Sequence, residues 1–294
     1  VIEIVKKQKI DIMVEVTGHT GVNRLNLMCF RLAPIQISYL AYPNTTGIEC
    51  IDYKFSDKYL IPNKMKKYFT EEIYELPYGI HCYTPNEEYF QINRIPNKNI
   101  RFGCFNNPVK FGSRCVKTFS DIMKKVPNSI LYIRYNKCHN NIIQGAIKSK
   151  FMFHGISSDR IDISYSNTKK EYIQMYNQID IVLDPFPYNG HTVNCEALWM
   201  GIPVITLEGN TYHERVGTSM LKHLKLYELV AKNTDEYIEK VVELSNDKKR
   251  RIEYNLTIKK KIQDHPMSDH KKFVKSIEDA YENIYQNFLK NENL

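Results

Sequence analysis

The sequence predicts an α/β fold made of two Rossmann-like, doubly wound domains that face a cleft. Three observations support this class. Short apolar runs alternate with helical patterns, the order typical of βαβ units and a parallel sheet. The length, 294 residues, suits two ordinary domains. Hydrophobic residues at 43% and charged residues at 25% are the usual balance of a globular protein.

The first domain is expected at residues 1–98, truncated at its N-terminus because the chain opens without Met and inside a helical pattern. Two buried strands are predicted at Asp11–Val16 and Pro34–Leu40. A helix is predicted between them at Asn23–Arg31. Residues 41–98 are rich in turn signals and are predicted to be mostly loop. The stretch Pro96–Asn99 is the candidate linker to the second domain.

The second domain is expected at residues 99–265. Its strands are predicted at Ile100–Phe105, Ser129–Arg134, Arg160–Ile163, Ile179–Leu183 and Pro203–Leu207. Ser113 is a candidate cap for the helix that follows the first strand. Thr168 and Glu171 have the spacing of a capping box at the start of another helix. Helices dominate from His213 onward, and residues 266–294 form a last, amphipathic segment.

The cysteines and histidines exclude several classes of protein. Seven cysteines are scattered without a C-x-x-C pair, which argues against a disulfide framework and a cysteine zinc site. The nine histidines contain no H-x-x-x-H pair. We therefore expect no metal and no cofactor, and a reducing compartment such as the cytoplasm, or the nucleus if the source is eukaryotic.

The charge distribution favours a small anionic ligand over a macromolecular polyanion. The net charge is +8, and much of it lies in Lys248–Arg251 and Lys259–Lys261, on predicted helices. Such runs are most often solvated helix faces, so nucleic acid is not an expected partner. No apolar run is long enough for a membrane span. An excess of cations does suit a nucleotide diphosphate.

The strongest candidate site is the loop Leu183–Thr192, which joins a predicted strand to a helix. Gly190 lets the backbone approach a ligand, and the free N–H groups around His191 and Thr192 would point at a diphosphate. Glu196 lies one turn further into the helix and could accept hydrogen bonds from ribose hydroxyls. The alternative is a tight turn with no ligand. The loop has neither a G-x-G-x-x-G pattern nor a Walker lysine.

Two further loops follow predicted strands. Lys110, after the strand that ends near Phe105, could neutralise leaving-group charge, although a loop lysine is usually just solvated. His19 lies in a Gly-bounded turn of the first domain and is a candidate catalytic base. A lone histidine beside a Gly turn is more often structural.

Ordered motifs along the chain resemble a known family. They include Gly18-His-Thr, Tyr42-Pro-Asn-Thr-Thr-Gly, Phe105-Asn-Asn with Lys110, Asp184-Pro-Phe-Pro-Tyr-Asn-Gly-His-Thr, Glu196-Ala-Leu-Trp-Met-Gly-Ile-Pro and Arg215-Val-Gly. The chain thus resembles the catalytic region of the O-GlcNAc transferase / SPINDLY family, glycosyltransferase family 41, from about residue 10 to about residue 245. The resemblance implies a GT-B fold whose C-terminal helix, within 266–294, packs back on the first domain.

The resemblance also implies roles for individual residues. Lys110 would contact the donor diphosphate and help the nucleotide leave. The other donor-binding positions would be Asn107, Lys169, Gly190, His191, Thr192 and Glu196. Three positions depart from the O-GlcNAc transferase pattern: Val193 replaces a threonine, and Tyr172 and Met175 replace a histidine and an arginine near the nucleotide.

The function implied is inverting, metal-independent transfer of a sugar to Ser or Thr of acceptor proteins. GlcNAc from UDP-GlcNAc is the favoured donor. The alternatives are fucose from GDP-fucose, used by plant members of the SPINDLY branch, and a non-catalytic nucleotide-binding scaffold. The resemblance further implies tetratricopeptide repeats upstream, which would bring in the acceptor proteins.

Overall fold

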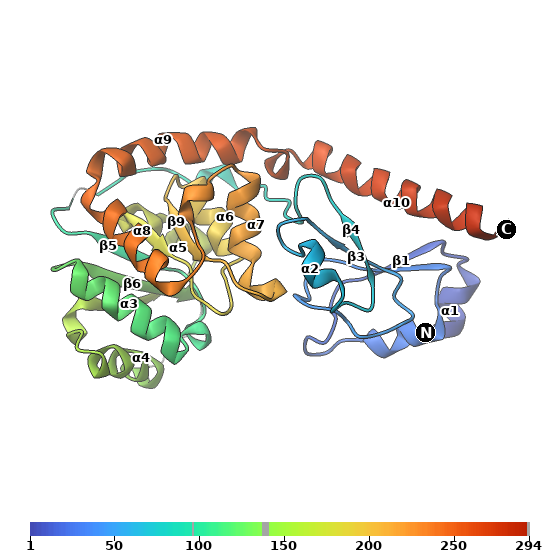
Figure 1. The fold of residues 1–294 in the computed structure, drawn as a ribbon, viewed down its shortest axis with the longest axis horizontal. Coiled ribbons are helices and arrows are strands. Elements are labelled where there is room, and N and C mark those ends of the chain that lie inside the picture. Colours follow the sequence, from blue (N-terminus) through green and yellow to red (C-terminus); the bar gives the residue numbers. More distant parts are fainter. Residues whose placement is uncertain (96, 137–140, 293–294) are drawn as a thin grey trace. The chain divides into compact units, whose positions relative to one another are not determined.

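The computed structural model describes residues 1–95, 97–136 and 141–292, which form two compact units (Figure 1). Unit 1 comprises Val1–Cys82, Asn210–His213 and Pro266–Leu294, and unit 2 comprises Tyr83–Gly209 and Glu214–His265. Each unit contains one parallel sheet. Pro96 and Cys138 lie outside the described residues, and the six described cysteines are free.

The boundary between the units lies after residue 82, earlier than the linker predicted at residues 96–99. Residues 83–95 belong to unit 2 because their side chains pack into it. The rings of Tyr83 and Phe90 lie 6.1 and 6.4 Å from the ring of Trp199. A Pro- and Asn-rich stretch suggested the linker, but these aromatic contacts decide where the unit begins.

Unit 1 has a four-stranded parallel sheet in the order β1-β2-β3-β4. The strands are β1 Ile12–Glu15, β2 Ile35–Ser38, β3 Tyr53–Ser56 and β4 Glu72–Glu75. Its helices are α1 Ile2–Lys7, α2 Asn63–Lys66 and α10 His270–Glu292, with the 3₁₀ turn η1 Leu25–Phe30. The two strands predicted in the first domain are confirmed.

Two predictions for unit 1 are wrong. The segment 41–98 contains β3 and β4, which sequence reasoning missed because four-residue strands carrying Lys54, Glu72 and Glu75 lack a long apolar run. The helix expected at 23–31 is the 3₁₀ turn η1, which ends where Arg31 adopts a left-handed conformation. The Gln36 side-chain amide donates to the carbonyl of Met28 at 2.9 Å and holds this turn against β2.

The sheet of unit 1 is buried on both faces. On one face, Ala280 and Ile284 of α10 pack with Ile35, Ile37 and Phe55, so α10 runs along the strands (Figure 1). A second cluster, centred on Leu25, Met28, Leu32 and Ile51, includes the partly buried Met13 of β1. Burial on both faces explains the continuous apolar character of β2.

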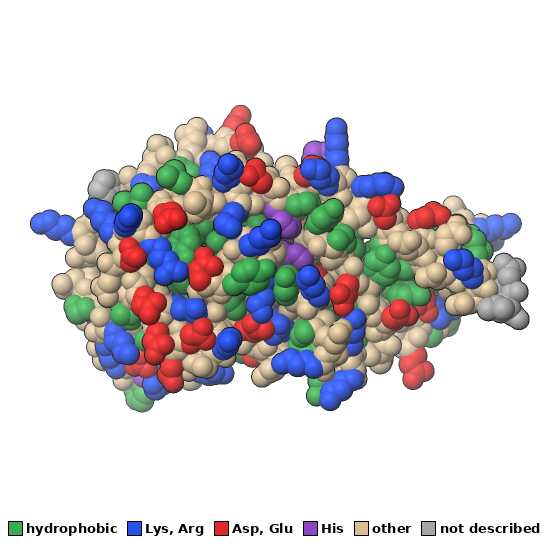
Figure 2. Space-filling view, turned by 45° about the horizontal axis from the view of Figure 1, so that its top comes forward, with side chains coloured by type: hydrophobic (Ala, Val, Ile, Leu, Met, Phe, Trp, Pro, Cys, Tyr) green, Lys and Arg blue, Asp and Glu red, His purple; other side chains and the backbone are tan. Residues whose placement is uncertain are grey.

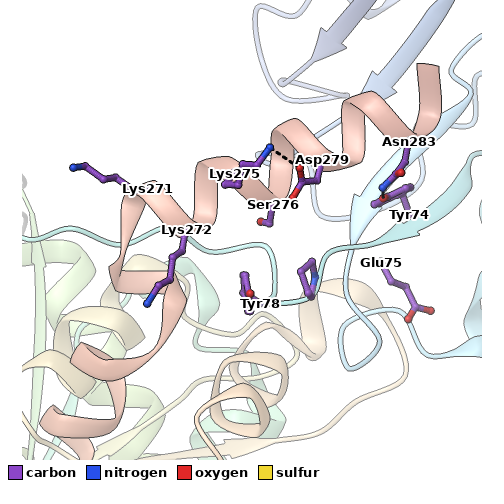
Figure 3. Close-up of a pocket in the computed structure, with 10 residues that line it drawn as sticks. Tyr74, Glu75, Tyr78, Lys271, Lys272, Lys275, Ser276, Asp279 and Asn283 are labelled. Atoms are coloured by element: carbon purple, nitrogen blue, oxygen red, sulfur yellow. Dashed lines mark hydrogen bonds and ion pairs between the residues drawn. The ribbon is translucent and has the colours of Figure 1, made fainter. Parts of the chain in front are cut away.

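A pocket of about 490 Å³ lies between the first turns of α10 and the end of β4 (Figure 3). Its lysines are largely paired: Lys275 lies 2.8 Å from Asp279 of the same helix, and Lys272 lies 3.3 Å from Asp269. Asn283 donates to the Tyr74 hydroxyl at 3.3 Å. The pocket thus follows the line of contact between α10 and the sheet, and local ion pairs offset much of its charge.

Unit 2 has a six-stranded parallel sheet in the order β10-β9-β8-β5-β6-β7. The strands are β5 Arg101–Cys104, β6 Ile130–Asn136, β7 Ile161–Ser166, β8 Ile181–Leu183, β9 Val204–Leu207 and β10 Val230–Ala231. All five predicted strands are confirmed. The sequence did not predict β10, because two residues carry no periodicity.

Helices cover both faces of this sheet, as in doubly wound folds. Helix α3 packs against α4 and α8, and α6 packs against α9. The helices are α3 Ser113–Lys125, α4 Asn141–Phe153, α5 Lys169–Gln174, α6 Thr192–Trp199, α7 Val216–His223, α8 Thr234–Asn246 and α9 Lys248–Asp264. Its short 3₁₀ turns are η2 Glu87–Tyr89, η3 Pro108–Lys110, η4 Ser158–Arg160, η5 Met175–Gln178 and η7 Tyr227–Leu229. The turn η8 Pro266–Ser268 belongs to unit 1, and η6 Tyr212–Glu214 contains residues of both units.

The capping box predicted at Thr168 and Glu171 is confirmed at the start of α5. The prediction that Ser113 caps α3 is wrong: Gly112 is the N-cap, and Ser113 is the first helical residue. No helix among the described residues combines the length and hydrophobicity needed to cross a membrane. On the face drawn in Figure 2, Lys and Arg are interspersed with Asp and Glu rather than gathered into one basic surface.

Candidate functional site

The loops that carry most of the predicted site residues meet at one place in unit 2. Strand β5 comes first in the unit and lies between β8 and β6, so the chain order reverses between β5 and β8. In open parallel sheets, ligands bind at such a switch point, outside the carboxyl ends of the strands. The loop after β5 carries Asn107 and Lys110, and the loop after β8 carries Gly190 and His191.

Lys110 bridges these two loops. Its ammonium group donates to the Asn106 side-chain oxygen at 2.9 Å and to the Asn189 carbonyl at 2.7 Å. It also lies 4.6 Å from the centre of the Tyr188 ring. An ammonium has three N–H donors, and these two bonds use two of them. Among the described residues no third acceptor is recorded for Lys110, so one donor can serve a ligand.

Burial lowers the pKa of Lys110, while the carboxylate of Asp184 opposes that effect. The turn η3 holds Lys110 in place, because the Asn107 side chain caps it by accepting from the Val109 N–H at 3.1 Å. Asn107 therefore acts here as a cap, with its amide group exposed beside Lys110.

Asp184, which sequence reasoning did not single out, organises the loop after β8. Its carboxylate is fully buried and accepts from the Gly190 N–H and the Thr206 hydroxyl, both at 2.6 Å. Burial raises the pKa of Asp184 to about 6, against these hydrogen bonds and the charge of Lys110, which lower it. A Cβ at Gly217 would lie 2.4 Å from the carboxylate, so only glycine fits there. The sequence feature that could have identified Asp184 is its position directly after a predicted buried strand.

Gly190 was expected to let the backbone approach a ligand, and the structure shows that it is also needed for packing. A Cβ at this position would lie 2.5 Å from the Asn194 side-chain oxygen and 2.7 Å from a Val193 methyl group. Asn194 in turn donates to the Gly190 carbonyl at 3.0 Å. The close approach that requires glycine is therefore to the first turn of α6.

Helix α6 begins at Thr192, with His191 as its N-cap residue. The first N–H groups of a helix have no partner within the helix, so this end attracts anions. Thr192 is exposed, whereas His191 is partly buried. Burial first, and the charge of Lys110 second, lower the pKa of His191 to about 4. His191 is therefore neutral at pH 7.

This pKa gives a testable titration. Because the unfolded value is about 6.5, stability gained from a neutral His191 is complete above pH 6.5 and is lost as the pH falls towards 4. NMR of the imidazole should show His191 titrating near pH 4, and the Lys110→Met variant should raise this pKa part of the way towards 6.5. Titration near 6.5 in both proteins would contradict the arrangement of the two residues.

Glu196 lies on α6 but is not open to solvent. Its side chain is 1% exposed, and Lys169 forms an ion pair with it. The Tyr176 hydroxyl donates to its other oxygen at 3.3 Å. Burial raises the pKa of Glu196, and Lys169 opposes this. Burial and these two donors restrict the access of a ribose hydroxyl to the carboxylate, a constraint that sequence spacing did not reveal.

His19 is the one predicted site residue in unit 1. Its Nε2 lies 2.7 Å from the Thr46 carbonyl, and its ring packs edge-on against Tyr42 at 5.2 Å. A carbonyl can only accept, so Nε2 carries the hydrogen and Nδ1 carries the lone pair of the neutral ring. Gly18 must be glycine, because it has a φ of +51° and a Cβ there would lie 2.2 Å from Tyr42.

A buried lysine near His19 was not predicted. Lys54 on β3 is 1% exposed and donates to the Ser38 hydroxyl at 3.2 Å and to the Tyr42 carbonyl at 3.1 Å. Burial lowers its pKa to about 8, while the carboxylates of Glu71 and Glu15 oppose the shift. Among the described residues, no group of three or more His, Cys, Asp or Glu side chains is placed to hold a metal ion.

Comparison with known proteins gives three kinds of match. The chain matches the model of Glycosyl transferase family 41 over residues 1–84 and 84–277. It is 34% identical to the probable UDP-N-acetylglucosamine–peptide N-acetylglucosaminyltransferase SPINDLY of Solanum lycopersicum, over 97% of this chain and 31% of that protein. It is 28% identical to the corresponding protein SEC of Arabidopsis thaliana, over 95% of this chain and 30% of that protein. The chain thus spans about a third of the length of these relatives.

Among solved structures, a mutant of the O-GlcNAc transferase of Thermobaculum terrenum superposes with a TM-score of 0.93 at 29% identity. The match covers 99% of this chain and 56% of that one. It confirms the GT-B type of α/β fold that the sequence motifs implied.

Proposed function

Because the chain belongs to glycosyltransferase family 41, we propose that it is the catalytic region of a protein O-glycosyltransferase. In this proposal it transfers GlcNAc from UDP-GlcNAc to Ser and Thr side chains of proteins. One observation supports the proposal above all. At the switch point of the sheet in unit 2, Lys110 donates to the Asn189 carbonyl in the loop directly before the N-terminus of α6. A single cation and a helix N-terminus are what a leaving diphosphate requires.

In the proposed reaction, the acceptor hydroxyl attacks the anomeric carbon from the side opposite the diphosphate, which inverts that carbon. The bond from the carbon to the diphosphate oxygen breaks, and its electron pair leaves with the nucleotide. The ammonium of Lys110 and the first N–H groups of α6, after His191, would stabilise the added charge. The proposal therefore assigns to these groups the role that a divalent cation has in other transferases, and requires no cofactor.

The hydroxyl proton must pass to a base as the new bond forms. His19 is the candidate within this chain, because its Nδ1 carries the lone pair while Nε2 is held by the Thr46 carbonyl. Asn107, Lys169, Gly190, Thr192 and Glu196 are proposed to bind the donor. For Glu196, the ion pair with Lys169 suggests that the two side chains act as a unit beside the nucleoside.

GDP-fucose is the second candidate donor. Identity is higher to the SPINDLY relative, 34%, than to SEC, 28%. Tyr172 also stands where O-GlcNAc transferases have a histidine near the nucleotide. It is buried, and its hydroxyl donates to the Phe105 carbonyl at 2.9 Å, so it offers no free group to a base.

Thermal unfolding of this chain with UDP, UDP-GlcNAc, GDP and GDP-fucose tests the function and the donor. A ligand at 100 times its Kd stabilises by about 2.7 kcal/mol. We expect the uridine ligands to raise the Tm most, and the Lys110→Met variant to lose most of the shift. A larger shift with GDP-fucose would identify the alternative donor. No shift with any of the four would contradict both the transferase function and a nucleotide-binding scaffold.

The setting of the protein is also proposed. Its relatives are about three times longer, so we propose that tetratricopeptide repeats precede this region in the whole protein and deliver acceptor proteins. A cytoplasmic location, or a nuclear one in a eukaryote, is supported by the six free cysteines among the described residues.

A further inference from the structure

A second, strongly cationic pocket lies in unit 2 at the edge of the sheet opposite to Lys110. Its volume is about 390 Å³. Arg101 begins β5, and Asp180 comes directly before β8, so the pocket lies at the amino ends of the strands whose carboxyl ends carry the candidate donor loops. A four-residue strand spans about 13 Å, so one ligand phosphate cannot occupy both places.

The lining of this pocket has an excess of positive charge. Its charged residues are five cations and one carboxylate: Arg94, Lys98, Arg101, Lys248, Arg251 and Asp180. Asp180 is already used, because Arg101 forms an ion pair with it at 3.2 Å. The remaining cations have no carboxylate within the lining to balance them.

The guanidinium groups are held in fixed positions. The two terminal nitrogens of Arg94 donate to the carbonyls of Tyr176 and Met200, and its Nε is buried with no partner among the described residues. Nη1 of Arg251 donates to the carbonyls of Leu244 and Ser245, both at 2.6 Å. Because these bonds fix the conformations of the two side chains, little conformational entropy would be lost when a ligand binds beside them.

Burial in the pocket disfavours the charged form of two of its arginines. Burial first, and the charge of the neighbouring Arg101 to a smaller extent, lower the pKa of Arg94 to about 10, while Asp180 opposes them. Burial also lowers the pKa of Arg251. An anion in the pocket would favour the charged form of both side chains.

The sequence of α9 adds an independent argument. The helix begins with Lys248-Lys249-Arg250-Arg251 and has no acidic residue in its first turn. Cations at a helix N-terminus oppose the helix dipole, and the side chain of Asp247 is the one local compensation as N-cap. Two of these four cations, Lys248 and Arg251, line the pocket. A bound anion would therefore interact favourably with the helix end and with the side chains.

We propose that this pocket binds the phosphate group of a small phosphorylated molecule, separately from the sugar donor. Guanidinium forks match the oxygens of a phosphate, and the volume exceeds that of one phosphate, which leaves room for a small organic part. The proposal does not depend on the glycosyltransferase function, because it uses none of the residues assigned to the donor.

Inorganic pyrophosphate is the probe, titrated by calorimetry at constant ionic strength into the whole chain carrying Lys110→Met, so that the candidate donor site is weakened. Saturable binding is expected to persist. Lys248→Glu should weaken it by about tenfold. Lys249→Glu is the matched control: it makes the same charge change one residue away, at an exposed position outside the pocket, and should change Kd by less than about twofold.

Equal weakening by the two charge reversals would mean that pyrophosphate responds only to the overall charge of α9, and would overturn the proposal. Loss of all binding in the Lys110→Met background would do the same, because it would place the phosphate at the donor loops. Lys248 is exposed, so neither reversal is expected to affect folding, which circular dichroism would check.

Discussion

Turnover of the Lys110→Ala variant is expected to fall by about 10²–10³, the usual cost of removing one donor that stabilises transition-state charge. The ammonium of Lys110 donates to the carbonyl of Asn189, in the loop directly before α6. The nucleotide should still bind, more weakly, through the N–H groups of the helix. Single-turnover transfer to an acceptor protein, with the full-length protein, measures the effect.

Two variants complete this experiment. Lys110→Met keeps much of the length of the side chain beside Tyr188 but removes the charge and the N–H donors, so it should lose as much turnover as Lys110→Ala. Lys117→Ala removes an exposed lysine that pairs with Asp121 on α3, and should leave turnover unchanged. Near-normal turnover of Lys110→Met would rule out the assigned role, because the whole ammonium group would have been removed while the bulk of the side chain stayed.

The second large effect is expected at Asp184. In Asp184→Ala, the Gly190 N–H and the Thr206 hydroxyl lose their buried acceptor. Each unsatisfied buried group costs about 1–3 kcal/mol, so we expect roughly 3 kcal/mol of destabilisation in urea unfolding at pH 7. Asp121→Ala, which breaks a surface pair, should cost less than about 1 kcal/mol. Equal losses in the two variants would show that Asp184 does not organise the loop.

Asp184→Asn separates the charge of Asp184 from its hydrogen bonds. The amide can still accept from Gly190 and donate to the Thr206 hydroxyl, so the fold should survive. The folded pKa of Asp184, about 6, lies above the unfolded value of about 3.9. The folded state therefore binds the proton of Asp184 more tightly than the unfolded state does. This protonation contributes its full stability below pH 4, and the contribution is lost as the pH rises through 6. The difference in stability between the native protein and Asp184→Asn should show this dependence, and a difference that is flat between pH 4 and 7 would contradict it.

Local patterns along the chain were enough to predict most elements of unit 2. Its central strands β8 and β9 are mostly apolar because both faces of a doubly wound sheet are buried. The capping box at Thr168 is encoded within four residues. The errors fell where a structure depends on distant partners. Strands β3 and β4 are stabilised by pairing with their neighbours rather than by their own apolar content. The α-helix expected at 23–31 is a 3₁₀ turn, and the Gln36 side chain holds its Met28 carbonyl.

The sequence by itself determined the family and the candidate loops, because both are encoded in short runs of residues whose order along the chain is visible. Only the tertiary structure decided which side chains meet. It brought Lys110 into a hydrogen bond with the carbonyl of Asn189 and Asp184 into one with the N–H of Gly190. It also paired Glu196 with Lys169. It also placed Lys248 and Arg251, from a basic run expected to be a solvated helix face, in the lining of a pocket with Arg94 and Arg101. Lys110 and Asn189 are 79 residues apart, and Lys169 and Glu196 are 27 apart. These pairs meet because parallel pairing of the strands brings the loops that follow separate strands to the same end of the sheet, which no local pattern can reveal.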